Sequence, residues 1–152
     1  MTDSLQILHE HHVYHGKIRP NQIIITKKNG VKLIGFGDPM EDLAHDVFKD
    51  DVFTARDSHY SSVEQFMKEG VLGSQTDVYG LTATIYHCIT RCELMEFYAR
   101  IGKKDRMQTP IECGANISIK QNAAIMKGLA PFDFERYQTI EELLYDIYAG
   151  VE

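Results

Sequence analysis

The stretch that decides the fold is LHEHHVYHGKIRPNQIIITKKNGVKLIGFGDP, residues 8–39. Within it, the β-rich runs NQIIIT (21–26) and VKLIGF (31–36) flank the sequence KKNG. Branched apolar residues favour strands, and the pair Asn29 and Gly30 readily supplies the positive φ angles of a tight turn. The stretch therefore predicts a β-hairpin.

The residues on either side of this stretch differ in character. Before it, Asp3 and Gln6 have the spacing of a helix start, and Leu5 and Leu8 share one helical face, so we expect a short helix that ends near His12. After it, residues 37–61 are acidic and lack any hydrophobic period. That length without periodicity predicts a long surface loop.

Helices are predicted to dominate the rest of the chain. Each predicted start places a hydroxyl three residues before an acidic or amide side chain. The pairs are Ser62 with Gln65, Ser74 with Asp77, Ser118 with Gln121, and Thr139 with Glu142. The segment DVYGLTATIYHCIT (77–90) is apolar nearly all round, which predicts a buried central helix, with Val78, Leu81, Ile85 and Ile89 on one side and Tyr79, Ala83 and Tyr86 on another. The last helix carries one apolar stripe, formed by Ile140, Leu143, Leu144, Ile147 and Val151.

Composition narrows the class of protein. With 152 residues and 43% hydrophobic content, the chain is predicted to form one mainly α domain: a helical bundle around a buried central helix, with a small hairpin near its N-terminus. The net charge of −6 comes without a basic run, which argues against nucleic acid as a partner. Cys88, Cys92 and Cys113 lack the spacing of a disulfide framework or zinc site, which favours reduced thiols in the cytoplasm. No run approaches the roughly 20 apolar residues of a membrane span.

Residues 8–39 resemble the catalytic loop and metal-binding loop of a protein kinase, in which H-R-D-x-x-x-x-N precedes a hairpin that ends in D-F-G. Here these motifs read His15-Gly16-Lys17, Gln22 and Gly35-Phe36-Gly37. Further resemblances follow in the family's order: YSSVEQF (60–66) to A-P-E, SQTDVYGLTATIYHCIT (74–90) to the buried central helix, and PFDFERYQTIEELL (131–144) to the closing motif. The sequences of these motifs, notably YSSVEQF and ERYQTIEELL, are most similar to those of bacterial serine/threonine kinases of the eukaryotic-like type.

This resemblance implies a kinase C-terminal lobe over the whole chain, residues 1–152. Residues 1–13 would be the first helix, 14–37 the catalytic-loop-like segment and hairpin, 38–61 an activation-segment-like loop, and 62–152 the helical subdomain. No Gly-rich loop or V-A-I-K-like lysine occurs, so we expect the N-terminal lobe to be absent and ATP not to bind this chain alone. Whether Met1 is a native start is left open.

The resemblance also implies which residues hold the shape of the lobe. Asp77 matches the aspartate that holds the backbone of the catalytic loop. His15 and Phe36 match two stacked rings of the family's internal spine. Glu64 and Arg136 match a buried ion pair, which is costly to break from one side.

The positions that carry the family's catalytic and metal-binding side chains, by contrast, hold other residues. Lys17 stands where the family has its catalytic aspartate, and an ammonium group cannot serve as a carboxylate base. Gly35 replaces the D-F-G aspartate that holds magnesium, and it has no side chain with which to ligate a metal. Gln22 replaces the second metal-binding residue, an asparagine, with an amide that reaches one methylene farther. Arg19 conservatively replaces a phosphate-facing lysine. Gly16 replaces the arginine that pairs with a phosphorylated activation segment.

Several further groups invite a functional interpretation. The histidines at positions 9, 11, 12 and 15 could bind a metal, but the kinase-like pattern already accounts for His9 and His15, so we expect no metal site. Lys17 could be a nucleophile or phosphate anchor, although a solvated or locally paired lysine is the simpler interpretation. The sequence also leaves open phosphorylation at Thr54, Ser58, Ser61 and Ser62, binding by Tyr14, Tyr79 and Tyr86, and docking of a basic partner at Asp42, Asp46, Asp50 and Asp51. Each of these groups has a simpler structural interpretation as loop, cap, packing or solvated residues.

The functional hypothesis is a catalytically inactive kinase-like C-lobe, a pseudokinase, that acts as a protein-binding, scaffolding or regulatory module without a cofactor. We expect a protein partner, with a homo-oligomer that buries Ile23–Ile25 and Leu33 as one form. The alternative is part of a longer kinase-like protein that binds nucleotide or transfers phosphate by an atypical route. A third interpretation is simple degeneration of a truncated gene product. The partner and the pathway are left open by the sequence.

Overall fold

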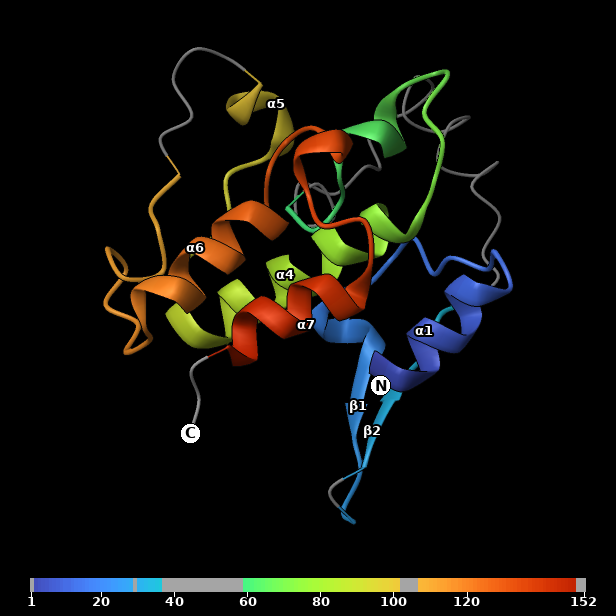
Figure 1. Cartoon of the computed structure of the whole chain (residues 1–152), viewed down its shortest axis with the longest axis horizontal. Coiled ribbons are helices and arrows are strands. Elements are labelled where there is room, and N and C mark those ends of the chain that lie inside the picture. Colours follow the sequence, from blue (N-terminus) through green and yellow to red (C-terminus); the bar gives the residue numbers. More distant parts are fainter. Residues whose placement is uncertain (1, 29, 37–58, 102–106, 150–152) are drawn as a thin grey trace.

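The computed structural model describes residues 2–28, 30–36, 59–101 and 107–149. Helices are the main regular structure of the described chain (Figure 1). The α-helices are α1 (Thr2–Glu10), α4 (Ser74–Thr90), α5 (Phe97–Arg100), α6 (Ile119–Gly128) and α7 (Ile140–Tyr148). Short 3-10 turns lie at Pro20–Gln22, Val63–Phe66 and Asp133–Glu135. The predicted mainly α fold with one hairpin is confirmed.

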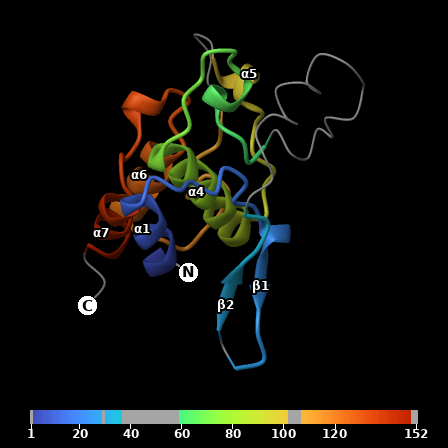
Figure 2. The same cartoon turned by 90° about the vertical axis from the view of Figure 1, so that its right-hand side faces the viewer.

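The hairpin pairs β1 (Ile23–Ile25) with β2 (Val31–Leu33) in antiparallel register, with Ile23 opposite Leu33 and Ile25 opposite Val31. It projects from the helical body (Figure 2). Five residues, 26–30, connect the strands, and the amide of Thr26 donates to the carbonyl of Gly30 at 2.8 Å. The connection is therefore longer than a two-residue turn, and Asn29 lies outside the described residues.

Helix α4 is the central helix, as predicted. Two apolar clusters contain its buried apolar residues. The first unites Leu5, Ile18, Val78, Leu81, Ala124, Tyr137, Ile140 and Leu143. The second unites Tyr79, Ala83, Tyr86, Leu94, Met107, Ile125 and Leu129. Tyr79 and Tyr86 are each 1% exposed, so packing explains them. Ile89 is 39% exposed, because it lies in the last turn of α4, beyond the residues that the clusters cover.

The predicted helix starts hold only in part: Asp3 already lies inside α1, and Ser62 caps a short 3-10 turn, Val63–Phe66, instead of an α-helix. The structure confirms the hydroxyl caps of Ser118 and Thr139, which accept from the amides of Gln121 and Glu142. Ser74 is not a cap: α4 begins at Ser74, its N-cap is Gly73, and Asp77 is directed elsewhere. The spacing rule failed here because the Asp77 carboxylate bonds a distant loop instead of its own helix end.

The outer helices α1 and α7 contact one another beside the core. Helix α1 ends at Glu10, two residues before the predicted end, and His12 adopts a left-handed φ of 58°. In α7, Ile140 and Leu143 are buried whereas Tyr145 is 78% exposed, so the one-sided helix is confirmed. Val151 lies outside the described residues.

Candidate functional site

Asp77, in the first turn of α4, binds the backbone of the catalytic-loop-like segment. Its Oδ2 accepts from the backbone amide of His15 at 2.8 Å, and its Oδ1 accepts from that of Gly16 at 2.7 Å. The ring Nε2 of His9, in α1, lies 2.8 Å from the same Oδ2. One buried carboxylate thus joins α1, the loop and the central helix. No local pattern predicts the pairing of His9 with Asp77, because the two residues are 68 positions apart in the sequence.

His15 and Phe36 lie together across the site. Their ring centroids are 4.3 Å apart in an edge-on arrangement. The His15 Nε2 is 2.8 Å from the carbonyl oxygen of Ile34, and its Nδ1 accepts from the amide of Lys17 at 3.2 Å. Since Nδ1 accepts, Nε2 carries the proton and donates to Ile34. The imidazole therefore links the loop to the end of the hairpin.

Glu64 and Arg136 form a buried, bidentate ion pair. The two guanidinium nitrogens donate to the two carboxylate oxygens at 2.9 and 2.6 Å. Arg136 also donates to the carbonyls of Gln75 and Pro131, and Glu64 accepts from the Thr76 hydroxyl. Burial opposes ionisation of Glu64, but hydrogen bonds and charge from Arg136, with a smaller contribution from Ser62, lower its pKa.

Gln65, which its spacing from Ser62 predicts only as part of a helix start, links two segments of the lobe. Its Oε1 accepts from the amide and hydroxyl of Ser62, and its Nε2 donates to the carbonyl of Gly16 at 2.5 Å. Gly16 has a φ of 71°, a conformation that glycine adopts without strain. The A-P-E-like segment is thereby tied to the catalytic-loop-like segment. The capping-box spacing was the visible signal, but the partner 49 residues away was not.

Two of the replaced positions, Gln22 and Gly35, lie side by side at the open end of the hairpin. Gln22 precedes β1, Gly35 follows β2, and the Ile34 amide donates to the Gln22 carbonyl at 2.9 Å. Gly35 has a φ of 86°, and a Cβ placed there would overlap the amide oxygen of Gln22. The Gln22 side chain therefore fills the space that a longer residue at position 35 would need. Both substitutions are evident from residue identity, whereas the fit of one residue against the other is not.

A surface cavity of about 350 Å³ lies beside the same loop. Its lining includes Arg19, Asn21, His59, Tyr60, His87 and Glu93. The pKa of Tyr60 is raised, chiefly by burial and secondarily by Cys88 and Glu93. His87 Nδ1 is 3.3 Å from the Cys92 carbonyl, which requires a proton on Nδ1 for a hydrogen bond.

The remaining candidate groups do not converge. Among the described residues, no group of three or more His, Cys, Asp or Glu side chains is arranged to hold a metal ion. Ser62 is buried and serves as a cap. Thr54, Ser58 and the acidic positions 42, 46, 50 and 51 lie outside the described residues. In the part of the chain that the structure describes, no helix combines the length and apolarity of a membrane span.

Comparison with known proteins identifies kinases. No family model matches the sequence. Serine/threonine-protein kinase PknB of Mycolicibacterium smegmatis is 26% identical over 153 residues, covering 95% of this chain and 24% of PknB. Dual specificity protein kinase zak2 of Dictyostelium discoideum is 28% identical over 93 residues, covering 59% of this chain and 15% of zak2.

A solved structure titled PpkA-294 apo form shares the fold with a TM-score of 0.77 and 19% identity. It covers 96% of this chain and 50% of that chain. The present chain thus spans about half of this structure and about a quarter of PknB. The chain is related in sequence to serine/threonine protein kinases, and its fold is that of a kinase C-terminal lobe.

Proposed function

We propose that this chain is a catalytically inactive, kinase-like C-lobe that acts by binding protein. The observation that carries the proposal is the substitution pattern at the loop and hairpin: Lys17 at the base position and Gly35 at the metal position, with the Gln22 side chain across the space beside Gly35.

Phosphoryl transfer depends on positioning and on charge stabilisation by metal ions that carboxylates hold. An ammonium group at position 17 neither accepts the substrate proton at neutral pH nor attracts a cation. Glycine at position 35 offers no oxygen ligand from a side chain, and Gln22 contributes only a neutral amide. Meanwhile the contacts of Asp77, His15 and the Glu64–Arg136 pair keep the lobe in shape. Because the catalytic and metal-binding positions are replaced whereas these structural contacts are kept, we infer a binding role.

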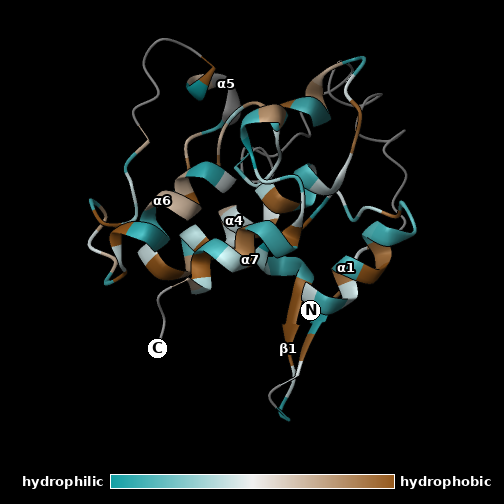
Figure 3. Ribbon diagram, viewed as in Figure 1, coloured by the Kyte–Doolittle hydropathy of each residue, from teal (hydrophilic) through white to brown (hydrophobic). Residues whose placement is uncertain are grey.

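The proposed binding face is the apolar surface of the hairpin and α1. Ile7 is 57% and Ile25 is 78% exposed, and Ile24, Val31, Ile34 and Phe36 are each more than two-fifths exposed. A groove of about 460 Å³ runs between α1 and β2. Figure 3 shows the apolar colouring of β1 on this projecting element. Apolar surface of this kind favours association, so the proposal includes a protein partner in the cytoplasm, with a homodimer over Ile23–Ile25 and Leu33 as its simplest form.

The test of inactivity uses this chain and, separately, the longest native protein that contains it. The Tm of each protein is measured with and without ATP plus Mg²⁺ or Mn²⁺. In a separate assay, each protein is tested for transfer of radiolabelled phosphate from ATP. We expect no thermal shift and no transfer, because a ligand that binds the native state would raise Tm. Transfer that disappears in Lys17→Met or Arg19→Met would overturn the proposal in favour of an atypical enzyme. Transfer that persists unchanged in both variants identifies a contaminating kinase and leaves the expected result intact.

The test of association is light scattering across a concentration series, with Ile25→Glu as the variant and Ile119→Glu, another highly exposed isoleucine, as its control. We expect wild type and Ile119→Glu to self-associate and Ile25→Glu to be monomeric. A monomeric wild type at high concentration contradicts the homodimer.

A further inference from the structure

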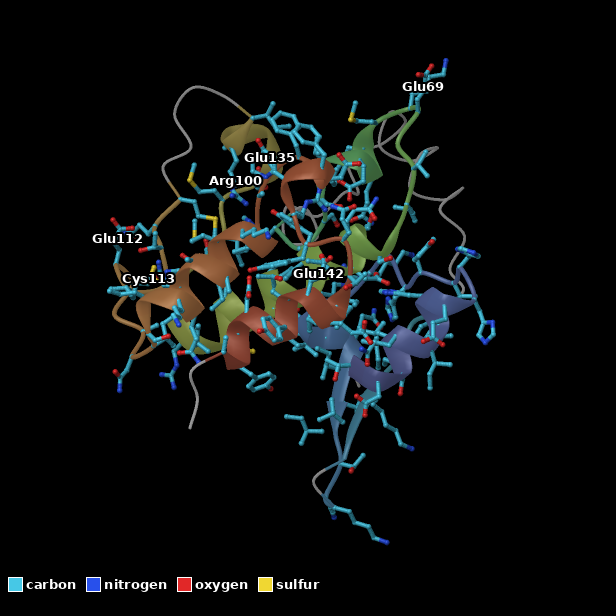
Figure 4. The ribbon with its side chains drawn as sticks, in the orientation of Figure 1. Glu69, Arg100, Glu112, Cys113, Glu135 and Glu142 are labelled. Atoms are coloured by element: carbon cyan, nitrogen blue, oxygen red, sulfur yellow. The ribbon has the colours of Figure 1, made fainter. Side chains whose placement is uncertain are left out.

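Two thiols lie together away from the catalytic-loop-like segment. Cys92 follows the C-terminal end of α4, and Cys113 lies in the segment before α6. Both are half-buried, and all three cysteines of the chain are free. Figure 4 shows Cys113 on the opposite side of the helical body from α1. The proposed binding role uses neither residue.

The side chains of Cys92 and Cys113 pack against the same core cluster, that of Tyr86. The Cys113 sulfur is 3.2 Å from the Tyr86 hydroxyl. The Cys92 thiol lies beside that of Cys113, and this neighbour, with a smaller contribution from burial, raises the pKa of Cys92. The two side chains are therefore neighbours although they are 21 positions apart in the sequence.

Both cysteines have an anchored backbone. The Cys92 amide donates to the Thr90 hydroxyl at 3.0 Å, and its carbonyl faces His87 Nδ1 at 3.3 Å. The Cys113 amide donates to the carbonyl of Thr109 at 3.0 Å. Anchored neighbours lower the entropy lost when the sulfurs are joined.

We propose that Cys92 and Cys113 form a reversible intramolecular disulfide when the protein meets a low-molecular-weight disulfide such as oxidised glutathione. One thiol loses its proton, and the thiolate attacks the small disulfide, forming a mixed disulfide and releasing one glutathione thiolate. The second cysteine, as thiolate, displaces the other glutathione. The protein loses two protons and two electrons, and one oxidised glutathione becomes two reduced ones.

The bond has a structural consequence. It closes a loop that spans α5 and constrains the unfolded chain, so oxidation stabilises the fold. It also fixes the segment that begins with Glu93 and Leu94, which line the cavity beside Arg19. The disulfide would thereby restrain one wall of that cavity.

The experiment compares wild type, Cys92→Ser, Cys113→Ser and the matched control Cys88→Ser, each treated with oxidised glutathione. Cys88 is exposed on α4 and is the only cysteine outside the proposed pair. We expect wild type and Cys88→Ser to lose two alkylatable thiols, to yield one Cys92–Cys113 cross-linked peptide, and to gain a Tm rise on the order of 10 °C that dithiothreitol removes. Cys92→Ser and Cys113→Ser should show neither the Cys92–Cys113 cross-linked peptide nor the Tm rise.

Peptide mapping of the wild type decides the question even if a variant fails to fold. Stable glutathione adducts on both cysteines without a cross-link would overturn the proposal. A cross-link that involves Cys88, or an equal Tm rise in Cys92→Ser, would do the same.

Discussion

The buried pair of Glu64 and Arg136 gives the sharpest test of how this lobe is held together. The Arg136 side chain is fully buried and that of Glu64 is 6% exposed. Arg136→Met removes both bonds to Glu64 and leaves the carboxylate with only neutral hydroxyl partners, those of Thr76 and Ser62. We expect a loss of roughly 3–5 kcal/mol in the free energy of unfolding, because an uncompensated charge stays buried.

The single variants should not add. Glu64→Gln leaves the Arg136 charge buried, although the carbonyls of Gln75 and Pro131 still accept from it, so its loss should be smaller than that of Arg136→Met. In the double variant neither charge remains unpaired. We therefore expect the double variant to be more stable than the sum of the single losses predicts, by about 2 kcal/mol or more.

Urea unfolding followed by far-UV circular dichroism measures all these variants, with equal m-values as the check on two-state behaviour. Lys120→Met, on the exposed side of α6, is the control for loss of a cation and should change stability by less than about 0.5 kcal/mol. Strict additivity, within about 0.5 kcal/mol, would refute coupling between the two side chains. A loss below about 1 kcal/mol in Arg136→Met would refute the uncompensated-charge reasoning.

The same pair predicts a pH dependence. The pKa of Glu64 is lower in the folded protein than its ordinary value of about 4.3, so the unfolded chain binds the proton first as pH falls. The stability that Glu64 contributes is fully present above that ordinary value and is lost as pH falls through the lower folded pKa. The difference in unfolding free energy between wild type and Glu64→Gln should be constant from pH 7 to about 5 and should shrink below about pH 4. A difference that grows on acidification contradicts this sign.

Two further predictions test the backbone contacts of the lobe. Gly70→Ala would push its methyl group into the carbonyl oxygen of Glu64 and should cost about 3 kcal/mol, whereas Gly114→Ala, at a positive φ with no heavy atom within 4 Å, should cost about 1 kcal/mol; equal losses in urea unfolding would contradict the steric argument. Asp77→Ala removes the acceptor of two backbone amides and of the His9 ring and should cost about 4 kcal/mol by the same measurement, with Asp77→Asn losing less because one oxygen remains. An alanine variant as stable as the wild type would show that these bonds contribute little.

Local patterns gave the elements of the fold. Two apolar runs around Gly30 predicted the hairpin, and apolar periodicity predicted both the central helix and the one-sided last helix. The error at Ser74 shows the limit of such patterns. A cap rule assumes that the side chain bonds its own helix, and Asp77 instead bonds a loop some 60 residues earlier in the chain.

The candidate site followed the same division. Motif order placed Lys17, Gln22 and Gly35 at the replaced positions, because residue identity alone shows which charges and ligands are missing. Contacts between distant residues were beyond that method. The bond from Gln65 to Gly16 and the fit of Gln22 against Gly35 depend on where the loop and hairpin meet.

The sequence by itself therefore determined the class of elements and the absence of the two carboxylates, since both are properties of residue type and local spacing. Only the tertiary structure decided how Asp77 joins three segments and which side chain occupies the space beside Gly35. It also decided that Cys92 and Cys113 are neighbours. The physical reason is that such contacts are set by the packing of the whole lobe around α4, and no local period in the sequence encodes them.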